Sequence, residues 1–129
     1  MKIFAVILSA LLLTACVQNP PVSPEVKAAA EKPLICNGKE QCDFYWERAL
    51  FYISSNSKFK VQTATDNLIQ TFSPTGQTAL VGYQVVREPL AKGEYRIWVR
   101  VWCDNMFGCI PDSTAEVANI KRYIAGQSQ

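Results

Sequence analysis

The sequence predicts an α+β fold in which a four-stranded antiparallel sheet carries two helices packed on one face, in the order α-β-β-β-β-α. Two segments, 43–57 and 113–126, space their apolar residues as a helix does, and four segments between 59 and 103 are strand-like and separated by turn residues. Consecutive strands joined by short turns pair antiparallel. Each helix has a single apolar stripe, which must be buried against the sheet.

The first predicted helix begins at Asp43, a residue type that caps helices well. Its apolar stripe comprises Trp46, Ala49, Leu50 and Ile53, which are spaced at i, i+3, i+4 and i+7. The Ser- and Asn-rich segment 54–57 favours turns, so we expect the helix to end there.

Four strands follow, over residues 59–65, 68–73, 78–87 and 94–103. The turns between them contain Asp66-Asn67, then Pro74-Thr75-Gly76-Gln77, then Ala91-Lys92-Gly93. Val81, Tyr83 and Val85 share one face of the third strand. In the fourth strand the core-facing residues are predicted to be Tyr95, Ile97, Val99, Val101 and Cys103.

The second helix is predicted to begin at Ser113. Ser113 and Glu116 have the spacing of a capping box, in which each side chain satisfies a free backbone amide of the first turn. Val117, Ile120 and Ile124 form its apolar stripe, and Gly126 lies where a helix stop is expected.

Composition limits the function. The chain has 129 residues, of which 49% are apolar and 19% charged, as in a single globular domain. Its formal charge of +2 is too balanced for a nucleic-acid-binding protein. The chain has no histidine, the commonest general base and metal ligand, and its carboxylates are scattered. It also lacks a phosphate loop and a nucleophile motif. We therefore expect no enzyme activity, no cofactor and no metal.

The N-terminus has the layout of a secretory signal. Lys2 precedes an apolar run over residues 3–13, which is shorter than the roughly twenty residues of a membrane-spanning helix. The run ends at Leu13-Thr14-Ala15-Cys16, which resembles the lipobox of bacterial lipoproteins. That resemblance implies that the signal is cleaved before Cys16. It further implies that the Cys16 thiol is linked to diacylglycerol and that its new amino group is acylated, palmitate being a typical chain.

The same resemblance implies in which membrane the protein is located. In Gram-negative lipoproteins an Asp directly after the modified Cys favours retention in the inner membrane, and this chain has Val17 there. We therefore expect lipid anchoring in the outer membrane, facing the periplasm. The mature domain resembles small Gram-negative lipoproteins to which no activity is assigned.

Three regions follow from these patterns. Residues 1–15 are the lipoprotein signal peptide, and residues 16–33 combine the lipidated Cys16 with a proline-rich, flexible tether. The alanines at 28–30 favour a short helix over 25–32, which we do not expect to be stable alone. Residues 34–126 form the small α+β domain.

Without Cys16, four cysteines remain, in a compartment that is expected to be oxidising. Three pairings are possible. We favour the local ones, Cys36–Cys42 and Cys103–Cys109, because turn residues within each segment allow small loops to close. A cross-pairing between the two ends is the alternative. The spacing is too long for a typical zinc site.

The outward face of the fourth strand is the candidate binding surface. Arg96, Trp98, Arg100 and Trp102 alternate on it, and Trp and Arg are enriched at binding hot spots. We expect the Cys103–Cys109 loop to extend this surface, with Met106 and Phe107 at its tip. The structural alternative is that a loop or the tether covers the Trp rings and that Phe107 packs beneath the sheet end.

These patterns favour a non-catalytic, lipid-anchored cell-envelope protein that binds an envelope protein or a glycan through its sheet face. One alternative is an inhibitor of wall-degrading enzymes that acts through the Cys103–Cys109 loop. Two others are a structural spacer and, least favoured, a carboxylate-based hydrolase.

Overall fold

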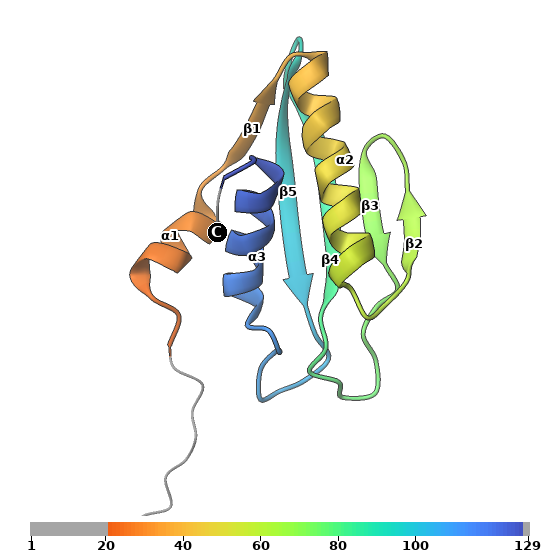
Figure 1. Ribbon diagram of the computed structural model, residues 1–129. Coiled ribbons are helices and arrows are strands. Elements are labelled where there is room, and N and C mark those ends of the chain that lie inside the picture. The colour runs from red at the N-terminus through yellow and green to blue at the C-terminus, as the bar shows by residue number, and fades with distance from the viewer. Residues whose placement is uncertain (1–20, 128–129) are drawn as a thin grey trace, which may run out of the picture.

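The computed structural model describes residues 21–127 and shows an α+β fold with an antiparallel sheet (Figure 1). The predicted signal sequence and the predicted lipidation site Cys16 lie outside the described residues. The elements in chain order are α1 (Pro24–Glu31), β1 (Leu34–Asn37), α2 (Lys39–Asn56), β2 (Val61–Ala64), β3 (Leu68–Thr71), β4 (Gly82–Ala91), β5 (Glu94–Trp102) and α3 (Ser113–Ile124). The predicted fold class is confirmed, although the sheet has five strands and the described chain has three helices.

The sheet has the order β1-β5-β4-β3-β2, and every neighbouring pair is antiparallel. The helices α2 and α3 lie on one face of it, and α1 lies beside α3 (Figure 1). The core fills the space between these helices and the sheet. Its fully buried side chains include Ile53, Ile69, Tyr83, Val85, Ile97, Ile120 and Ile124. The faces predicted for β4 and β5 are therefore the ones observed.

The strand that the sequence analysis missed is β1. It pairs with the first half of β5, from Leu34 opposite Ile97 to Asn37 opposite Glu94. Four residues are too few to show a clear alternation, and the partner strand lies some sixty residues away in the chain. The prediction of four strands is therefore corrected to five.

The N-cap of the first predicted helix lies five residues earlier than expected. Gly38, with φ 81°, is the N-cap of α2, so Asp43 is not the cap and lies within the helix. The amide of Asn37 donates to Oε1 of Gln41 at 2.7 Å, which ties the preceding strand to the first turn. Asp43 pairs instead with Lys39 and Arg87.

Part of the segment expected to be a flexible tether is α1. Ser23 caps this helix by accepting from the amide of Val26 at 3.3 Å, and proline occupies its first position. At the other end, Nζ of Lys121 donates to the carbonyl oxygens of Ala30 at 2.6 Å and Lys32 at 2.9 Å. Contacts with α3 thus stabilise a helix that is too short to be stable alone.

The cap of α3 also differs from the prediction. Asp112, not Ser113, is the N-cap, and its carboxylate accepts from the amide of Ala115 at 3.0 Å. Glu116 does not return to the helix start as a capping box requires. It is only 5% exposed and accepts from the hydroxyls of Tyr52 at 2.7 Å and Tyr83 at 2.8 Å.

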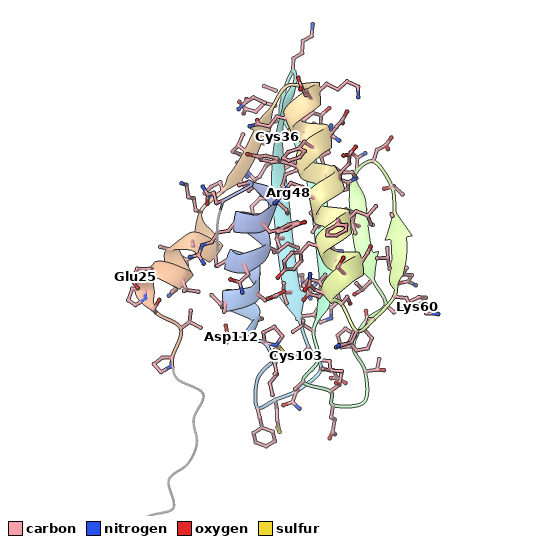
Figure 2. The ribbon with its side chains drawn as sticks, viewed as in Figure 1. Glu25, Cys36, Arg48, Lys60, Cys103 and Asp112 are labelled. Atoms are coloured by element: carbon pink, nitrogen blue, oxygen red, sulfur yellow. A yellow bond between two sulfur atoms is a disulfide. The ribbon has the colours of Figure 1, made fainter. Side chains whose placement is uncertain are left out.

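Both favoured disulfides, Cys36–Cys42 and Cys103–Cys109, are present. The labelled Cys36 and Cys103 lie toward opposite ends of the sheet (Figure 2). Cys36 and Cys42 are fully buried and join β1 to α2, whereas Cys103 and Cys109 close the loop between β5 and α3. No helix in residues 21–127 has the length and apolar character needed to cross a membrane.

Candidate binding surface on the open sheet face

The sheet face opposite α2 and α3 is not covered by any helix of the part of the chain that the structure describes (Figure 1). We call it the open face. It carries the four predicted side chains of β5, namely Arg96, Trp98, Arg100 and Trp102, and their cross-strand neighbours on β4 and β3. The structure therefore places these four predicted residues on one surface, as alternation requires.

An apolar row crosses the middle of the open face. Trp98 lies directly opposite Val86 on β4, and Val86 lies opposite Leu68 on β3. The side chain of Trp98 is 51% exposed, while Val86 and Leu68 are half-buried. The row thus presents an indole ring on a flat apolar base, which is accessible from solvent.

A polar row lies beside it. Arg100 is opposite Gln84, and Gln84 is opposite Gln70. The Nε2 atom of Gln84 donates to Oε1 of Gln70 at 2.7 Å, so the two amides hold each other in place. Arg100 is exposed. This row offers a guanidinium and two amides for hydrogen bonding next to the indole.

On the other side of Trp98, Glu88 holds the indole and a neighbouring cation. The Nε1 atom of Trp98 donates to Oε2 of Glu88 at 2.5 Å, and Nη1 of Arg96 lies 3.7 Å from the same oxygen. The Arg96 guanidinium lies 5.0 Å from the Trp98 ring centroid, and that of Arg100 lies 4.8 Å from the Trp102 ring. These contacts preorganise the side chains, which lowers the entropy lost on binding.

Met106 and Phe107 lie beyond the end of the open face, on the loop from β5 to α3. They are 89% and 87% exposed, so Phe107 does not pack beneath the sheet. Asn105 shapes the loop, because its Oδ1 accepts from the amide of Phe107 at 2.8 Å and its Nδ2 donates to the carbonyl of Gln77 at 2.8 Å. The structure therefore exposes both side chains at the tip of the loop that follows β5.

Sequence reasoning missed an aromatic group on the outer side of α2. Phe44 and Phe51 are 49% and 63% exposed. The guanidinium of Arg48 lies 4.1 Å from the Tyr123 ring and 5.4 Å from the Phe44 ring, and Phe51 stacks on Tyr123 at 6.5 Å. Only the i, i+4 and i+7 spacing within α2 could have indicated this group, since Tyr123 comes from α3.

A charged cavity was also missed at the end of the sheet that holds the turn between β4 and β5, which we call the hairpin end. It has a volume of about 570 Å³ and is lined by Lys39, Asp43, Asp66, Arg87 and Tyr95, among others. The hydrogen bond from Lys39 lowers the pKa of the Asp43 carboxyl. The hydrogen bond to Asp43, and then the negative charge of Asp43, raise the pKa of Lys39. Residues 21–127 contain no cluster of three or more His, Cys, Asp or Glu residues that could hold a metal ion.

Glu116 is the one buried carboxylate that the structure describes. Its Oε1 accepts from Tyr52 and Tyr83, and its Oε2 accepts from Nδ2 of Asn119 at 3.5 Å. Burial, and then the hydrogen bond to Glu116, raise the pKa values of Tyr52 and Tyr83. These three groups satisfy one another inside the core. Their arrangement is that of a structural polar cluster rather than of a site open to substrate.

Comparison with protein-family models, with curated proteins and with solved structures found no match for this chain. Function is therefore inferred from the residues themselves. Among the surfaces described above, the open face combines an accessible aromatic ring, an apolar base and ordered polar side chains.

Proposed function

We propose that this protein is a lipid-anchored, non-catalytic component of the cell envelope that binds a glycan strand through its open face. The observation that carries the proposal is the half-exposed Trp98 ring, which lies between the polar row of Arg100 and the charged pair of Arg96 and Glu88.

The chemistry of this surface suits a sugar polymer. The apolar face of a pyranose ring packs on an indole, which supplies a large contact area with few rotatable bonds. Arg100 lies next to Trp98 on the same face, where its guanidinium is placed to bind a carboxylate or a hydroxyl. Wall glycans with attached peptides supply pyranose rings, carboxylates and hydroxyls.

The proposed location has separate support. The lipobox-like Leu13-Thr14-Ala15-Cys16 implies a lipid anchor, and two disulfides in a small domain fit an oxidising compartment outside the cytoplasm. Two or three acyl chains on Cys16 would hold the protein stably at a membrane, whereas one chain gives only reversible binding.

The test is sedimentation of the purified mature protein with insoluble peptidoglycan. We expect Trp98→Ala and Arg100→Ala each to weaken binding about tenfold, the loss typical of a truncated hot-spot residue. Phe51→Ala is the matched control, because Phe51 is an exposed aromatic residue on α2, away from the open face. It should bind as the unchanged protein does.

Two results would contradict the glycan proposal. One is that both open-face variants sediment with the wall as well as the control does. The other is that the unchanged protein does not sediment, while crosslinking in cells captures an envelope protein that Trp98→Ala loses; in that case the open face binds protein.

A further inference from the structure

We propose that the end of the domain formed by the loops 72–81 and 103–112 rests on the membrane, with Met106 and Phe107 inserted among the lipid headgroups. We call this region the loop end. The inference rests on the proposed lipid anchor at Cys16, and it adds a second contact with the same bilayer and a fixed orientation.

Exposed apolar side chains gather at the loop end. On these two loops they are Phe72 at 50%, Leu80 at 43%, Ile110 at 65%, Phe107 at 87% and Met106 at 89% exposure. Apolar groups gathered in this way mark either a protein interface or a membrane contact. Aromatic and long apolar side chains of this kind are the ones that enter the headgroup region.

The two loops form one ordered unit. The amide of Ile110 donates to the carbonyl of Ala79 at 2.8 Å, and the amide of Gln77 donates to Oδ2 of Asp104 at 3.0 Å. The Cys103–Cys109 disulfide closes the longer loop. The apolar tips are therefore held in place before any contact is made, and insertion would cost little conformational entropy.

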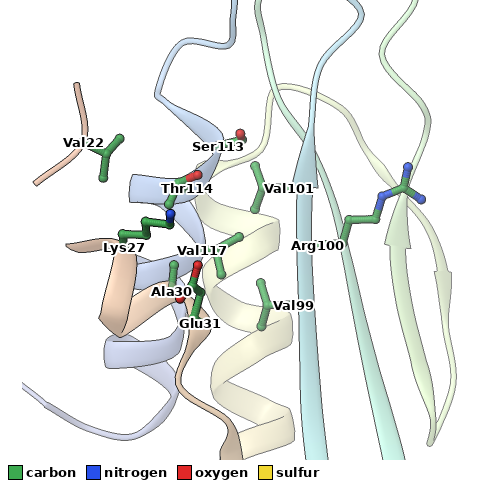
Figure 3. Close-up of a pocket in the computed structure, with 10 residues that line it drawn as sticks. All are labelled: Val22, Lys27, Ala30, Glu31, Val99, Arg100, Val101, Ser113, Thr114 and Val117. Atoms are coloured by element: carbon green, nitrogen blue, oxygen red, sulfur yellow. The ribbon is translucent and has the colours of Figure 1, made fainter. Parts of the chain in front are cut away.

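The chain also enters the domain at this end. Val22 lines a cavity of about 390 Å³ together with Ser113 and Thr114, the first residues of α3 (Figure 3). The loop 103–112 leads directly into Ser113. From Val22, α1 runs toward the C-terminal half of α3, where Lys121 contacts the carbonyl of Ala30.

The length of chain before Val22 limits the orientation. Cys16 precedes Val22 by six residues, which span about 20 Å when fully extended. The nine residues of β5, which run from the opposite hairpin end to the loop end, span about 30 Å. The chain between a lipidated Cys16 and Val22 is therefore too short to reach past the domain, so it keeps the loop end toward the bilayer.

Anchoring removes the need for strong binding by the loops. Once the lipid is in the membrane, loop contact becomes an intramolecular event with a high effective concentration. A few exposed apolar side chains then suffice to orient the domain, although they would not recruit it alone.

The test uses the full mature protein, made in a Gram-negative host and reconstituted into phosphatidylethanolamine and phosphatidylglycerol vesicles that contain lipid with brominated acyl chains. Phe107→Trp and Leu80→Trp report on the loop end, and Phe51→Trp is the control on the outer side of α2. We expect bromine to quench the added fluorescence of Phe107→Trp at least twofold more than that of Phe51→Trp, with Leu80→Trp between them.

The outcomes separate this inference from the proposed function. Intact mass and membrane fractionation first show whether the protein is acylated and bound. If it is anchored but Phe107→Trp is quenched no more than Phe51→Trp, the orientation is wrong while the anchor stands. If, in addition, the unchanged protein inhibits lysozyme and Phe107→Ala abolishes that inhibition, the loop is an inhibitor element and not a membrane contact. If the protein is not acylated, the anchor and the orientation are both rejected.

Discussion

Glu116 shows how a single side chain can have two competing roles. Its spacing from Ser113 favours a helix cap, but Asp112 takes that position and leaves the glutamate free to turn inward. A buried carboxylate is costly unless donors surround it. Tyr52 from α2 and Tyr83 from β4 provide those donors, so Glu116 links both helices of the helix layer to the sheet.

Removing this carboxylate should destabilise the fold. We expect Glu116→Ala to lower the free energy of unfolding by about 3 kcal/mol, because two buried hydroxyls lose their acceptor. Glu116→Gln should cost about 1 kcal/mol, since an amide oxygen still accepts both bonds. Urea unfolding measures both, with the exposed Glu47→Ala as control. Equal stability of Glu116→Ala and Glu47→Ala would show that the cluster of Glu116, Tyr52 and Tyr83 does not stabilise the fold.

The two tyrosines also predict a dependence on alkaline pH. Burial and the bond to Glu116 raise the pKa values of Tyr52 and Tyr83 in the folded state, while unfolded tyrosine titrates near pH 10. Above about pH 10 the unfolded chain thus binds fewer protons than the folded one, and the free energy of unfolding falls as pH rises. The loss should approach 1.4 kcal/mol per pH unit for each tyrosine.

Urea unfolding between about pH 9 and about pH 11 tests this linkage. The double variant Tyr52→Phe/Tyr83→Phe keeps the rings and removes both ionisable hydroxyls. Its stability should fall less steeply over the same interval than that of the unchanged protein. Parallel curves for the two proteins would show that other groups cause the alkaline loss.

At the scale of the elements, the sequence predicts the strands and helices that have a clear local pattern, but not those that depend on long-range contacts. The strands β4 and β5 are long enough for their alternation to identify both faces, including Trp98 and Arg100 on the open one. By contrast, β1 and α1 are short and depend on partners far along the chain, namely β5 and Lys121 of α3. Because β1 and α1 are stabilised by tertiary contacts, no local sequence pattern predicts that they are stable.

The candidate site divides in the same way. Alternation along β5 predicts which of its residues share a surface, but not which residues of β4 and β3 lie beside them. Val86 and Leu68, which form the base under Trp98, depend on the register of three strands. That register is fixed by the hairpin and by the buried face, so the apolar row became visible only in the fold.

The two disulfides predict unequal contributions to stability. Both join cysteines six residues apart, so the chain-entropy term is about 2 kcal/mol for each. Cys36 and Cys42 are also fully buried and fix β1 to α2, whereas Cys103 and Cys109 are half-buried. We therefore expect Cys36→Ala/Cys42→Ala to cost about 4 kcal/mol and Cys103→Ala/Cys109→Ala about 2 kcal/mol. Urea unfolding of the two variants should separate them; equal losses would contradict a core role for the first bridge.

At the scale of the whole molecule, the proposed anchor and the open face make compatible demands. The strands run between the loop end and the hairpin end (Figure 1). With the loop end on the membrane, the open face would stand upright on the bilayer. Trp98 and Arg100 would then face the space in which wall glycan lies, and the lipid would not compete for that surface.

The anchor itself gives the last prediction. If Cys16 is lipidated as proposed, Cys16→Ser removes the modified thiol, so the variant should leave the membrane fraction and lose the mass of the acyl chains. Val17→Asp is the matched change, because in Gram-negative lipoproteins that residue favours retention in the inner membrane. It should keep the acyl chains while moving the protein from the outer to the inner membrane fraction. Fractionation with intact mass measurement distinguishes the two, and a Cys16→Ser protein that stays membrane-bound would overturn the address, the tether length and the orientation together.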